Sequence, residues 1–251
     1  MFFQNVGQWA HFVRLCFHLL VSHGISGREF KKQLLRVGIQ SIPLTCAAGF
    51  FVGAILAIQI DSQIRDFGAQ SYLGGISVST TLRNLGPVLI AFFLAGRVGA
   101  FTSAELGTMS ITDQLNAIRC LGLNPIREIV IPRLLAVAVS SIVLLLMGLL
   151  MSVFGGISIA SIGLKVNPLQ FVHRVPEFLA VSSMVLALIK SIIFGLMIGS
   201  VSCFIGVHIS GGAEEVGGGV RRTAVVLVVG IIILDFMISW MGSQFVGLSQ
   251  W

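Results

Sequence analysis

The stretch Leu134–Leu164 reads LLAVAVSSIVLLLMGLLMSVFGGISIASIGL and contains no Asp, Glu, Lys or Arg. A helix needs about 20 consecutive apolar residues to cross the hydrocarbon core of a membrane. This stretch is longer than that, and it lacks the strict alternation of apolar and polar residues that is typical of membrane barrel strands. It predicts a transmembrane helix and an all-α integral membrane protein.

The composition of the whole chain agrees with a membrane environment. Of its 251 residues, 55% are hydrophobic and 10% are charged, whereas soluble globular chains carry about 25% charged residues. This excludes an ordinary soluble domain. Four further spans are expected at residues 42–60, 76–100, 181–207 and 224–245, which makes five transmembrane helices. In the first of them, Gly49 and Gly53 have the spacing that lets two helices approach closely.

Residues 1–36 precede the first crossing and have a different pattern. Apolar side chains recur there every three or four residues, as on one face of a helix, at Phe2, Val6, Trp9, Val13, Phe17 and Leu20. Basic residues follow at Arg28, Lys31, Lys32 and Arg36. We expect an amphipathic helix in the membrane interface and a cytoplasmic lead-in, followed by a five-span domain at 37–251.

Residues 101–133 carry too many charges to cross lipid and are expected outside the membrane. The charged residues are Glu105, Asp113, Arg119, Arg127, Glu128 and Arg133. Ser110 followed by Asp113 is typical of a capping box at a helix start, and Gly122 with Pro125 is typical of a helix end. The pattern predicts a short helix in this segment.

The basic residues indicate the orientation, because lysine and arginine favour the cytoplasmic side of a membrane. Most of them are cytoplasmic if the N-terminus, residues 101–133 and residues 211–222 lie on that side. The glycine-rich stretch 211–219 is expected to turn the chain there. The loop 165–177 and the C-terminus then lie on the opposite side.

Three ionisable residues fall within or beside the expected spans, where charges are costly unless paired or hydrated. Lys190 and Asp235 can pair with each other; alternatively, Lys190 extends to the interface and Asp235 bonds a hydroxyl such as that of Ser239. Only residues 84–96 separate Arg83 from Arg97, too few to cross the hydrocarbon core. We therefore expect Arg83 near the membrane boundary, facing a cavity.

The sequence contains no motif of enzyme catalysis. It has no GxxxxGK[ST], HExxH or GxSxG motif, and its four cysteines have no CxxC spacing. We expect no catalytic residue, no metal site, no cofactor on this chain and no nucleic-acid partner, so any ATP is used by another chain. Two alternatives are a secondary transporter that uses Lys190 and Asp235 as a relay, and an intramembrane enzyme, for which no nucleophile and base are assembled.

Several short motifs together point to one family. They are Leu82-Arg83-Asn84-Leu85-Gly86-Pro87, Ala95-Gly96-Arg97-Val98-Gly99, Ala104-Glu105-Leu106-Gly107-Thr108-Met109, Asp113-Gln114-Leu115-Asn116-Ala117, Leu123-Asn124-Pro125, Ile189-Lys190-Ser191 and Leu234-Asp235-Phe236. With them the chain resembles the MlaE/YrbE permeases of MCE-type ABC transporters, over roughly residues 40–246.

The resemblance implies a role in lipid transport. The chain would be the permease subunit of an ATP-driven system that moves phospholipid between the inner and outer membranes of a bacterium. It would form a homodimer in the inner membrane, with a cytoplasmic N-terminus and a periplasmic C-terminus. Its partners would be a cytoplasmic ABC ATPase that holds ATP and Mg, a periplasmic ring of MCE domains and, often, a small STAS-domain regulator.

The resemblance also implies which residues act. Coupling to the ATPase, within segment 101–133, would use Glu105, Leu106, Gly107, Thr108, Asp113, Gln114, Leu115 and Leu121. The lipid pocket would use Leu56, Ile60, Ile64, Phe67, Arg83 and Leu85. Apart from the resemblance, we also expect Asn84 and Lys190 to bind the lipid and Asp235 to be structural.

One position departs from the family pattern. Most members have Arg-Glu where this chain has Arg83-Asn84, so the acidic neighbour of the arginine is missing. Arg83 is then free to bind a lipid phosphate through two hydrogen bonds. Alternatively, Asn84 simply caps or packs.

Overall fold

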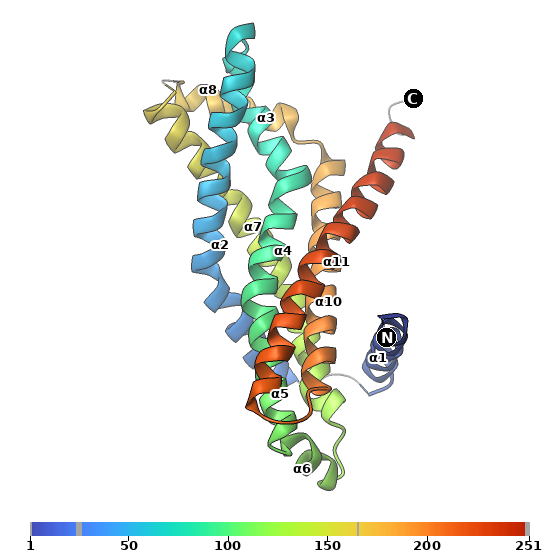
Figure 1. The fold of residues 1–251 in the computed structure, drawn as a ribbon. Helices are drawn as coiled ribbons and strands as arrows, with labels where there is room; N and C mark the ends of the chain where they lie inside the picture. Colours follow the sequence, from blue (N-terminus) through green and yellow to red (C-terminus); the bar gives the residue numbers. More distant parts are fainter. Residues whose placement is uncertain (1, 24–26, 165, 249–251) are drawn as a thin grey trace. The chain divides into compact units, whose positions relative to one another are not determined.

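Helices make up all the regular structure in the described part of the chain (Figure 1). The computed structural model describes the backbone of residues 2–23, 27–164 and 166–248, and the side chains of residues 7–20, 27–164 and 166–242. The α-helices are α1 (Phe2–His23), α2 (Gly27–Ile64), α3 (Leu73–Thr80), α4 (Gly86–Leu94), α5 (Ala100–Ile111), α6 (Gln114–Cys120), α7 (Ile131–Ile162), α8 (Pro168–His173), α9 (Val175–Phe178), α10 (Val181–Val207) and α11 (Ala213–Leu248). Short 3-10 turns are η1 (Arg65–Phe67) and η2 (Gln70–Tyr72), and π turns are η3 (Thr81–Leu85), η4 (Ala95–Gly99) and η5 (Ile126–Val130).

Five helical stretches among these residues are long and apolar enough to cross a membrane. They are Gly27–Phe67, Gln70–Ile111, Ile126–Ile162, Val181–Val207 and Ala213–Gly242. Each coincides with one predicted span, so the predicted fold class is confirmed. The stretch Val181–Val207 matches its predicted span at both ends, whereas the other four are longer than predicted. Helix α2 already begins at Gly27, so the predicted boundary after Arg36 falls inside a helix. That domain boundary remains a prediction.

The glycine-rich stretch corrects one expectation. Residues 211–219 are expected to turn the chain, but α11 begins at Ala213 and contains the last three of these glycines. Only Gly211 and Gly212 lie in the turn itself, and Gly211 has a φ of +117°. Gly219 faces the side chain of Ile209 with no room for a Cβ. It therefore serves close packing, which a helix tolerates, and not a reversal of the chain.

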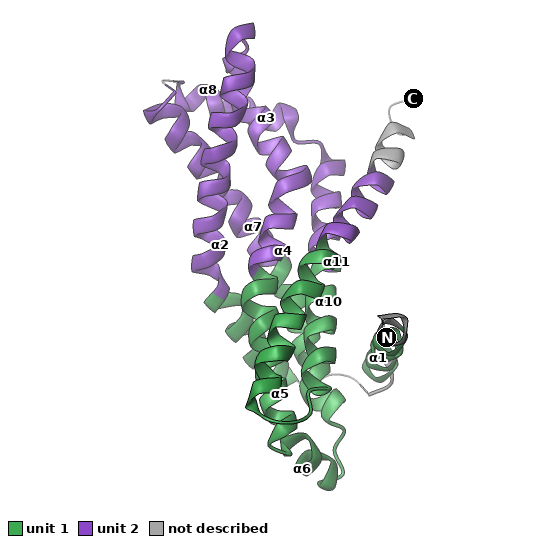
Figure 2. Ribbon diagram, in the orientation of Figure 1, with its two compact units in different colours: residues 1–40, 94–141, 193–231 green, residues 41–93, 142–192, 232–251 purple. Residues whose placement is uncertain are grey.

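The chain divides into two compact units (Figure 2). Unit 1 contains residues 1–40, 94–141 and 193–231, and unit 2 contains residues 41–93, 142–192 and 232–251. The boundaries fall within helices α2, α4, α7, α10 and α11. Each unit is therefore built from segments that are far apart in the sequence.

Two of the π turns precede a proline by the same distance. Turn η3 ends two residues before Pro87, and η5 ends two residues before Pro132. A proline within a helix has no N–H for the carbonyl four residues earlier, and its ring crowds that carbonyl. The carbonyls concerned are those of Arg83 and Glu128, each inside its π turn. The wider π turn relieves the crowding, so the two prolines account for these irregular turns.

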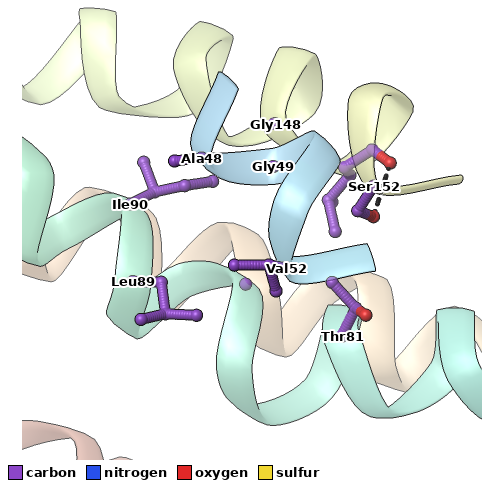
Figure 3. A pocket seen from close by; sticks show the side chains of 10 residues that line it. Ala48, Gly49, Val52, Thr81, Leu89, Ile90, Gly148 and Ser152 are labelled. Carbon is purple, nitrogen blue, oxygen red and sulfur yellow. Dashed lines mark hydrogen bonds between the residues drawn. The ribbon is translucent and has the colours of Figure 1, made fainter. Parts of the chain in front are cut away.

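In unit 2, glycines let α2 and α7 pack backbone to backbone. Gly49 faces the backbone of Gly148, Gly53 faces that of Ser152, and Gly155 faces that of Phe50. A Cβ at any of the three glycines would overlap a carbonyl oxygen. Figure 3 shows Gly49 of α2 beside Gly148 of α7. The close contact predicted from the Gly49–Gly53 spacing is confirmed.

Where a loop is expected at 165–177, residues 168–173 and 175–178 of unit 2 form the two short helices α8 and α9. Asn167 caps α8, because its side-chain oxygen accepts from the Leu169 N–H at 2.9 Å. Pro168 occupies the first turn, where its missing N–H costs nothing. Phe171 of α8 is buried in a cluster with Leu73 of α3, Ile60 of α2 and Ala160 of α7. Helices α8 and α9 thus close one end of the apolar core of unit 2.

In unit 1, helix α1 packs through one narrow face. Phe12 and Cys16 are buried against Leu106, Val130, Ile131 and Cys203. The Phe12 ring meets the Phe204 ring edge to face, with centroids 5.6 Å apart. Phe17 lies outside this contact and is 68% exposed, and the side chains of Phe2 and Val6 lie outside the described residues. The helix is amphipathic as predicted, and its interfacial position remains a prediction.

Candidate functional site

A buried lysine forms the first candidate site, in unit 2. Lys190 of α10 has no exposed surface. Its Nζ donates to Asp235 Oδ1 at 2.7 Å, to Ser239 Oγ at 2.8 Å and to the Arg83 carbonyl oxygen at 3.2 Å. Asp235 and Ser239 are four residues apart on α11, so both acceptors lie on one face of that helix. Every hydrogen of the ammonium group therefore has an acceptor.

This geometry decides between the two readings of Lys190 and Asp235. The residues form an ion pair, and Lys190 does not extend to an interface. Ser239 bonds the lysine. A buried charge is tolerated only when it is paired and its remaining hydrogens are bonded. The Arg83 carbonyl was not foreseen as the third acceptor, although Pro87 four residues later marked it as lacking a helical donor.

A cavity of about 280 Å³ lies beside this lysine site. Its lining residues are Arg83, Asn84, Leu186, Ser239 and Gly242. Ser239 belongs to both the cavity wall and the lysine site. The side chains of Arg83 and Asn84 are exposed, as expected for residues that face a cavity. A guanidinium, an amide and a hydroxyl can together bind an oxyanion such as a phosphate.

The other residues predicted to bind lipid are not gathered around this cavity. Leu56 and Ile60 are 6% and 8% exposed, and Ile64 packs against the same core cluster as Ile60. Phe67 is 84% exposed, and Leu85 is 39% exposed next to the cavity residues in the sequence. Lys190 lies behind Ser239 and does not line the cavity. A tail-binding pocket built from these apolar residues remains a prediction.

A second, very small pocket lies where α2, α4 and α7 meet in unit 2 (Figure 3). It is lined by Ala48, Gly49, Val52, Thr81, Gly86, Leu89, Ile90, Gly148, Leu149 and Ser152. Its volume of about 10 Å³ is near the space that one water molecule needs. It cannot hold an acyl chain.

A carboxylate between two arginines forms the second candidate site, in unit 1. Glu105 of α5 accepts from Arg36 of α2 at 2.9 Å and from Arg133 of α7 at 2.7 Å, one arginine on each oxygen. The guanidinium of Arg36 also lies over the Phe101 ring, 4.5 Å from its centroid. We call these three charged residues the Glu105 clamp. It ties the start of the charged segment to two other helices.

Burial is unequal within the Glu105 clamp. The side chain of Arg133 is 3% exposed, that of Glu105 is 27% exposed and that of Arg36 is 39% exposed. One nitrogen of Arg133, Nη1, is buried without a hydrogen-bond partner. Glu105 therefore balances a charge that has almost no access to solvent. The sequence could not reveal the clamp, because its arginines are far from Glu105 along the chain.

The remaining residues predicted for ATPase coupling divide into buried and exposed groups. Leu106, Gly107 and Leu115 are buried, and Gly107 packs against Ile209 without room for a Cβ. The exposed residues are Thr108, Asp113, Gln114 and Leu121. Leu121 is 76% exposed and Leu123 is 50% exposed, beside α6 at one end of unit 1 (Figure 1).

The predicted capping box at this end is wrong. Helix α5 continues to Ile111, and the Ser110 hydroxyl donates to the carbonyl oxygens of Ile209 at 2.8 Å and Val207 at 3.3 Å. Asp113 precedes α6 with a left-handed φ of 57° and bonds the side chain of Asn116 at 2.8 Å, instead of capping the backbone. Ser110 thus fastens α5 to the end of α10, which leaves α6 as a separate short helix.

Metal ligands are not assembled in the described residues, where no group of three His, Cys, Asp or Glu side chains could hold an ion. The five long apolar helices, with ionisable groups buried between them, define a multi-pass membrane protein. Polar interiors of this kind mark transport pathways in membrane proteins.

Comparison with known proteins specifies the class. Residues 30–241 match the family model described as Permease MlaE. The chain is 33% identical over 223 residues to a probable ABC transporter permease protein of Synechocystis sp., covering 89% of this chain and 85% of that protein. It is 31% identical over 238 residues to a probable ABC transporter permease protein of Rickettsia typhi, covering 95% and 92%. It is 34% identical over 218 residues to the chloroplastic protein TRIGALACTOSYLDIACYLGLYCEROL 1 of Arabidopsis thaliana, covering 86% and 61%. The chain belongs to the MlaE permease family and is a permease subunit of a transporter.

Proposed function

We propose that this permease carries phospholipid between the inner and outer membranes of a bacterium, powered by a separate ABC ATPase. The observation that carries the proposal is the cavity beside Arg83, where a guanidinium is open to a ligand next to the apolar side chain of Leu186. A lipid phosphate fits a guanidinium through two charge-assisted hydrogen bonds. The name of the similar Arabidopsis protein includes a galactolipid, and this supports a lipid as the cargo.

The cavity would hold only the polar part of a lipid. Its volume of about 280 Å³ is just below the ~300–1,000 Å³ that is typical of small-molecule sites. Each buried methylene of an acyl chain contributes about 0.8 kcal/mol, so most of the affinity would come from tails on apolar surface outside the cavity. Exposed Leu85 and Phe67 are the predicted pocket residues that remain open to a tail.

The end of unit 1 that carries α6 is the proposed contact with the ATPase. Leu121 and Leu123 are exposed there beside the polar side chains of Gln114 and Asn116. Such a mixture of apolar anchors and polar rim suits a protein interface. Leu115 faces the interior of unit 1 and would support the helix without touching the partner. Glu105 would act from inside the permease through its two arginines.

The remaining parts of the assembly follow from the family. We propose a homodimer in the inner membrane, a periplasmic ring of MCE domains and, in some systems, a STAS-domain regulator. The N-terminus and the α6 end would be cytoplasmic and the C-terminus periplasmic, as the basic residues indicate. Co-purification of this chain with its native partners tests these points together.

The lipid proposal is tested by counting phospholipid bound to equal amounts of the purified complex. Arg83→Ala should reduce bound phospholipid and transport, and Arg83→Lys should restore them only in part, since lysine lacks the two-point geometry. Arg174→Ala is the matched control, because Arg174 belongs to the same unit, has an exposed side chain, and pairs with the exposed Glu177 instead of facing the cavity. Equal lipid occupancy in the two alanine variants would show that the cavity is not the headgroup site.

A secondary transporter is the second candidate, because the Lys190–Asp235 pair joins a buried lysine to a half-buried aspartate, which a proton relay could use. Transport in vesicles distinguishes the two. Uptake by the isolated chain, driven by a proton gradient without ATP, would favour the relay. Uptake that requires the ATPase and survives collapse of the gradient would favour the ATP-driven permease.

A further inference from the structure

The Arg83 carbonyl is a backbone acceptor that its own helix cannot satisfy at the usual position. In an α-helix it would accept from the N–H of residue 87, but that residue is Pro87, which has none. A backbone carbonyl buried in an apolar surrounding needs a donor from elsewhere. Within a membrane this need is greater, because water is not generally available there.

Lys190 supplies that donor. Its Nζ lies 3.2 Å from the Arg83 carbonyl oxygen, and its other two hydrogen bonds, to Asp235 and Ser239, fix the ammonium at that position. Lys190 is completely buried, and the cavity wall is formed by Ser239 and not by the lysine. With its three hydrogens used inside the protein, Lys190 has none left for a ligand.

We propose that Lys190 is a positioning residue, whose ammonium replaces the N–H that Pro87 lacks and thereby holds the π turn Thr81–Leu85 with Arg83 and Asn84 facing the cavity. Asp235 balances the charge and Ser239 aims the ammonium. The inference rests on the proposed function only for what the cavity binds. The position of the π turn itself can be measured without any ligand.

The same geometry separates this role from two others. If Lys190 bound the cargo directly, its effect would not depend on Pro87. If Lys190 and Asp235 relayed protons, restoring a backbone N–H at position 87 would not replace them. Lys190 becomes dispensable when residue 87 regains an N–H only if its role is to donate a hydrogen bond to the Arg83 carbonyl.

The test starts from the double variant Lys190→Met/Asp235→Asn, which removes both charges and leaves no unpaired ion. The first readout is the labelling rate of Asn84→Cys by a hydrophilic thiol reagent, with Cys120→Ser in every protein because Cys120 is exposed. The second readout is phospholipid affinity of the purified full-length chain. A hydrogen bond from a charged donor is strong, so its loss should lower the labelling rate and the phospholipid affinity by about tenfold each.

Adding Pro87→Ala to the double variant should restore the labelling rate and the lipid affinity to within about threefold of the parent, because one ordinary backbone hydrogen bond returns. Pro132→Ala is the matched control. Pro132 also stands two residues after a π turn, but it belongs to unit 1. The carbonyl that lacks an N–H from residue 132 is that of Glu128, not that of Arg83. Pro132→Ala should restore neither readout.

Two results would overturn the inference. They are parental labelling in the double variant, whether or not lipid affinity is lost, and failure of Pro87→Ala to restore labelling. If the double variant does not fold, Ser239→Ala removes one support of the ammonium and should give a smaller fall in labelling that Pro87→Ala again reverses. If labelling behaves as expected but the parent binds no phospholipid, the proposed function fails and the role of Lys190 stands.

Discussion

Replacing Glu105 by glutamine should destabilise the permease mainly through Arg133. The side chain of Arg133 is 3% exposed, and Glu105 is its anionic partner at 2.7 Å. Removing one partner of a buried ion pair costs about 3–5 kcal/mol, because the other charge stays buried without compensation. Glu105 is 27% exposed, so water can replace part of the loss, and we expect about 3 kcal/mol.

The two arginines of the Glu105 clamp provide the internal comparison. Arg36 is 39% exposed and lies over the Phe101 ring, so Arg36→Gln should cost only about 1 kcal/mol, near the upper value for an exposed pair. Replacing both buried partners, as Glu105→Gln/Arg133→Met, should recover most of the loss, since apolar side chains of similar volume often match a buried ion pair.

Unfolding of the purified protein in mixed detergent micelles, followed by tryptophan fluorescence, measures these differences. At about 2–4 °C for each kcal/mol, as in soluble domains of similar length, Glu105→Gln should lower the midpoint by about 6–12 °C. Arg36→Gln should lower it by about 2–4 °C. Equal shifts for Glu105→Gln and Arg36→Gln would refute the assignment of the cost to buried Arg133.

Three further predictions concern packing, thiol exposure and orientation. Gly53→Val should abolish folded protein in size-exclusion chromatography, because its side chain would overlap the Ser152 backbone, whereas Gly96→Ala meets nothing within 4 Å and should behave like the parent. Exposed Cys120 should react with a maleimide at pH 8. Burial raises the pKa of Cys16 to about 11, so Cys16 should react slowly until the pH approaches that value. Similar rates for the two cysteines at pH 8 would contradict this. In cells with a permeable outer membrane and with Cys120→Ser, an impermeant reagent should label Gln170→Cys and not Asn116→Cys, and the reverse pattern would invert the proposed orientation.

The sequence predicted the transmembrane helices because each depends on local composition. It predicted both ends of α10 but not those of the other long helices. Helix α2 begins at Gly27 and α11 at Ala213, since a helix can continue beyond the membrane through polar residues and glycines that a hydropathy pattern reads as loop. The close contact at Gly49 and Gly53 was predictable because a four-residue spacing of small residues has a direct geometric meaning.

The candidate site was predictable only in part, because a sequence pattern reports local features and not how helices pack. Lys190, Asp235 and Arg83 were recognisable singly, because each is an ionisable residue in or beside an apolar stretch. Their arrangement depends on how α10 and α11 are rotated, which no local pattern specifies. The Glu105 clamp depends on the packing of α2, α5 and α7, and was therefore not visible before the structure.

Stability alone does not explain why a lysine is buried at position 190. A buried ion pair is often no more stable than apolar side chains of similar volume, so methionine with a neutral partner could fill the same space. Methionine cannot donate to the Arg83 carbonyl, which lies 3.2 Å from the ammonium and receives no N–H from residue 87, because that residue is proline. The Glu105 clamp differs, because Glu105 bonds its two arginines through side chains only. A proline substitution should therefore compensate for a loss in one site and not in the other. Pro132→Ala should leave the midpoint of Glu105→Gln lowered, and recovery of the parental midpoint would show that the clamp also acts through the backbone of η5.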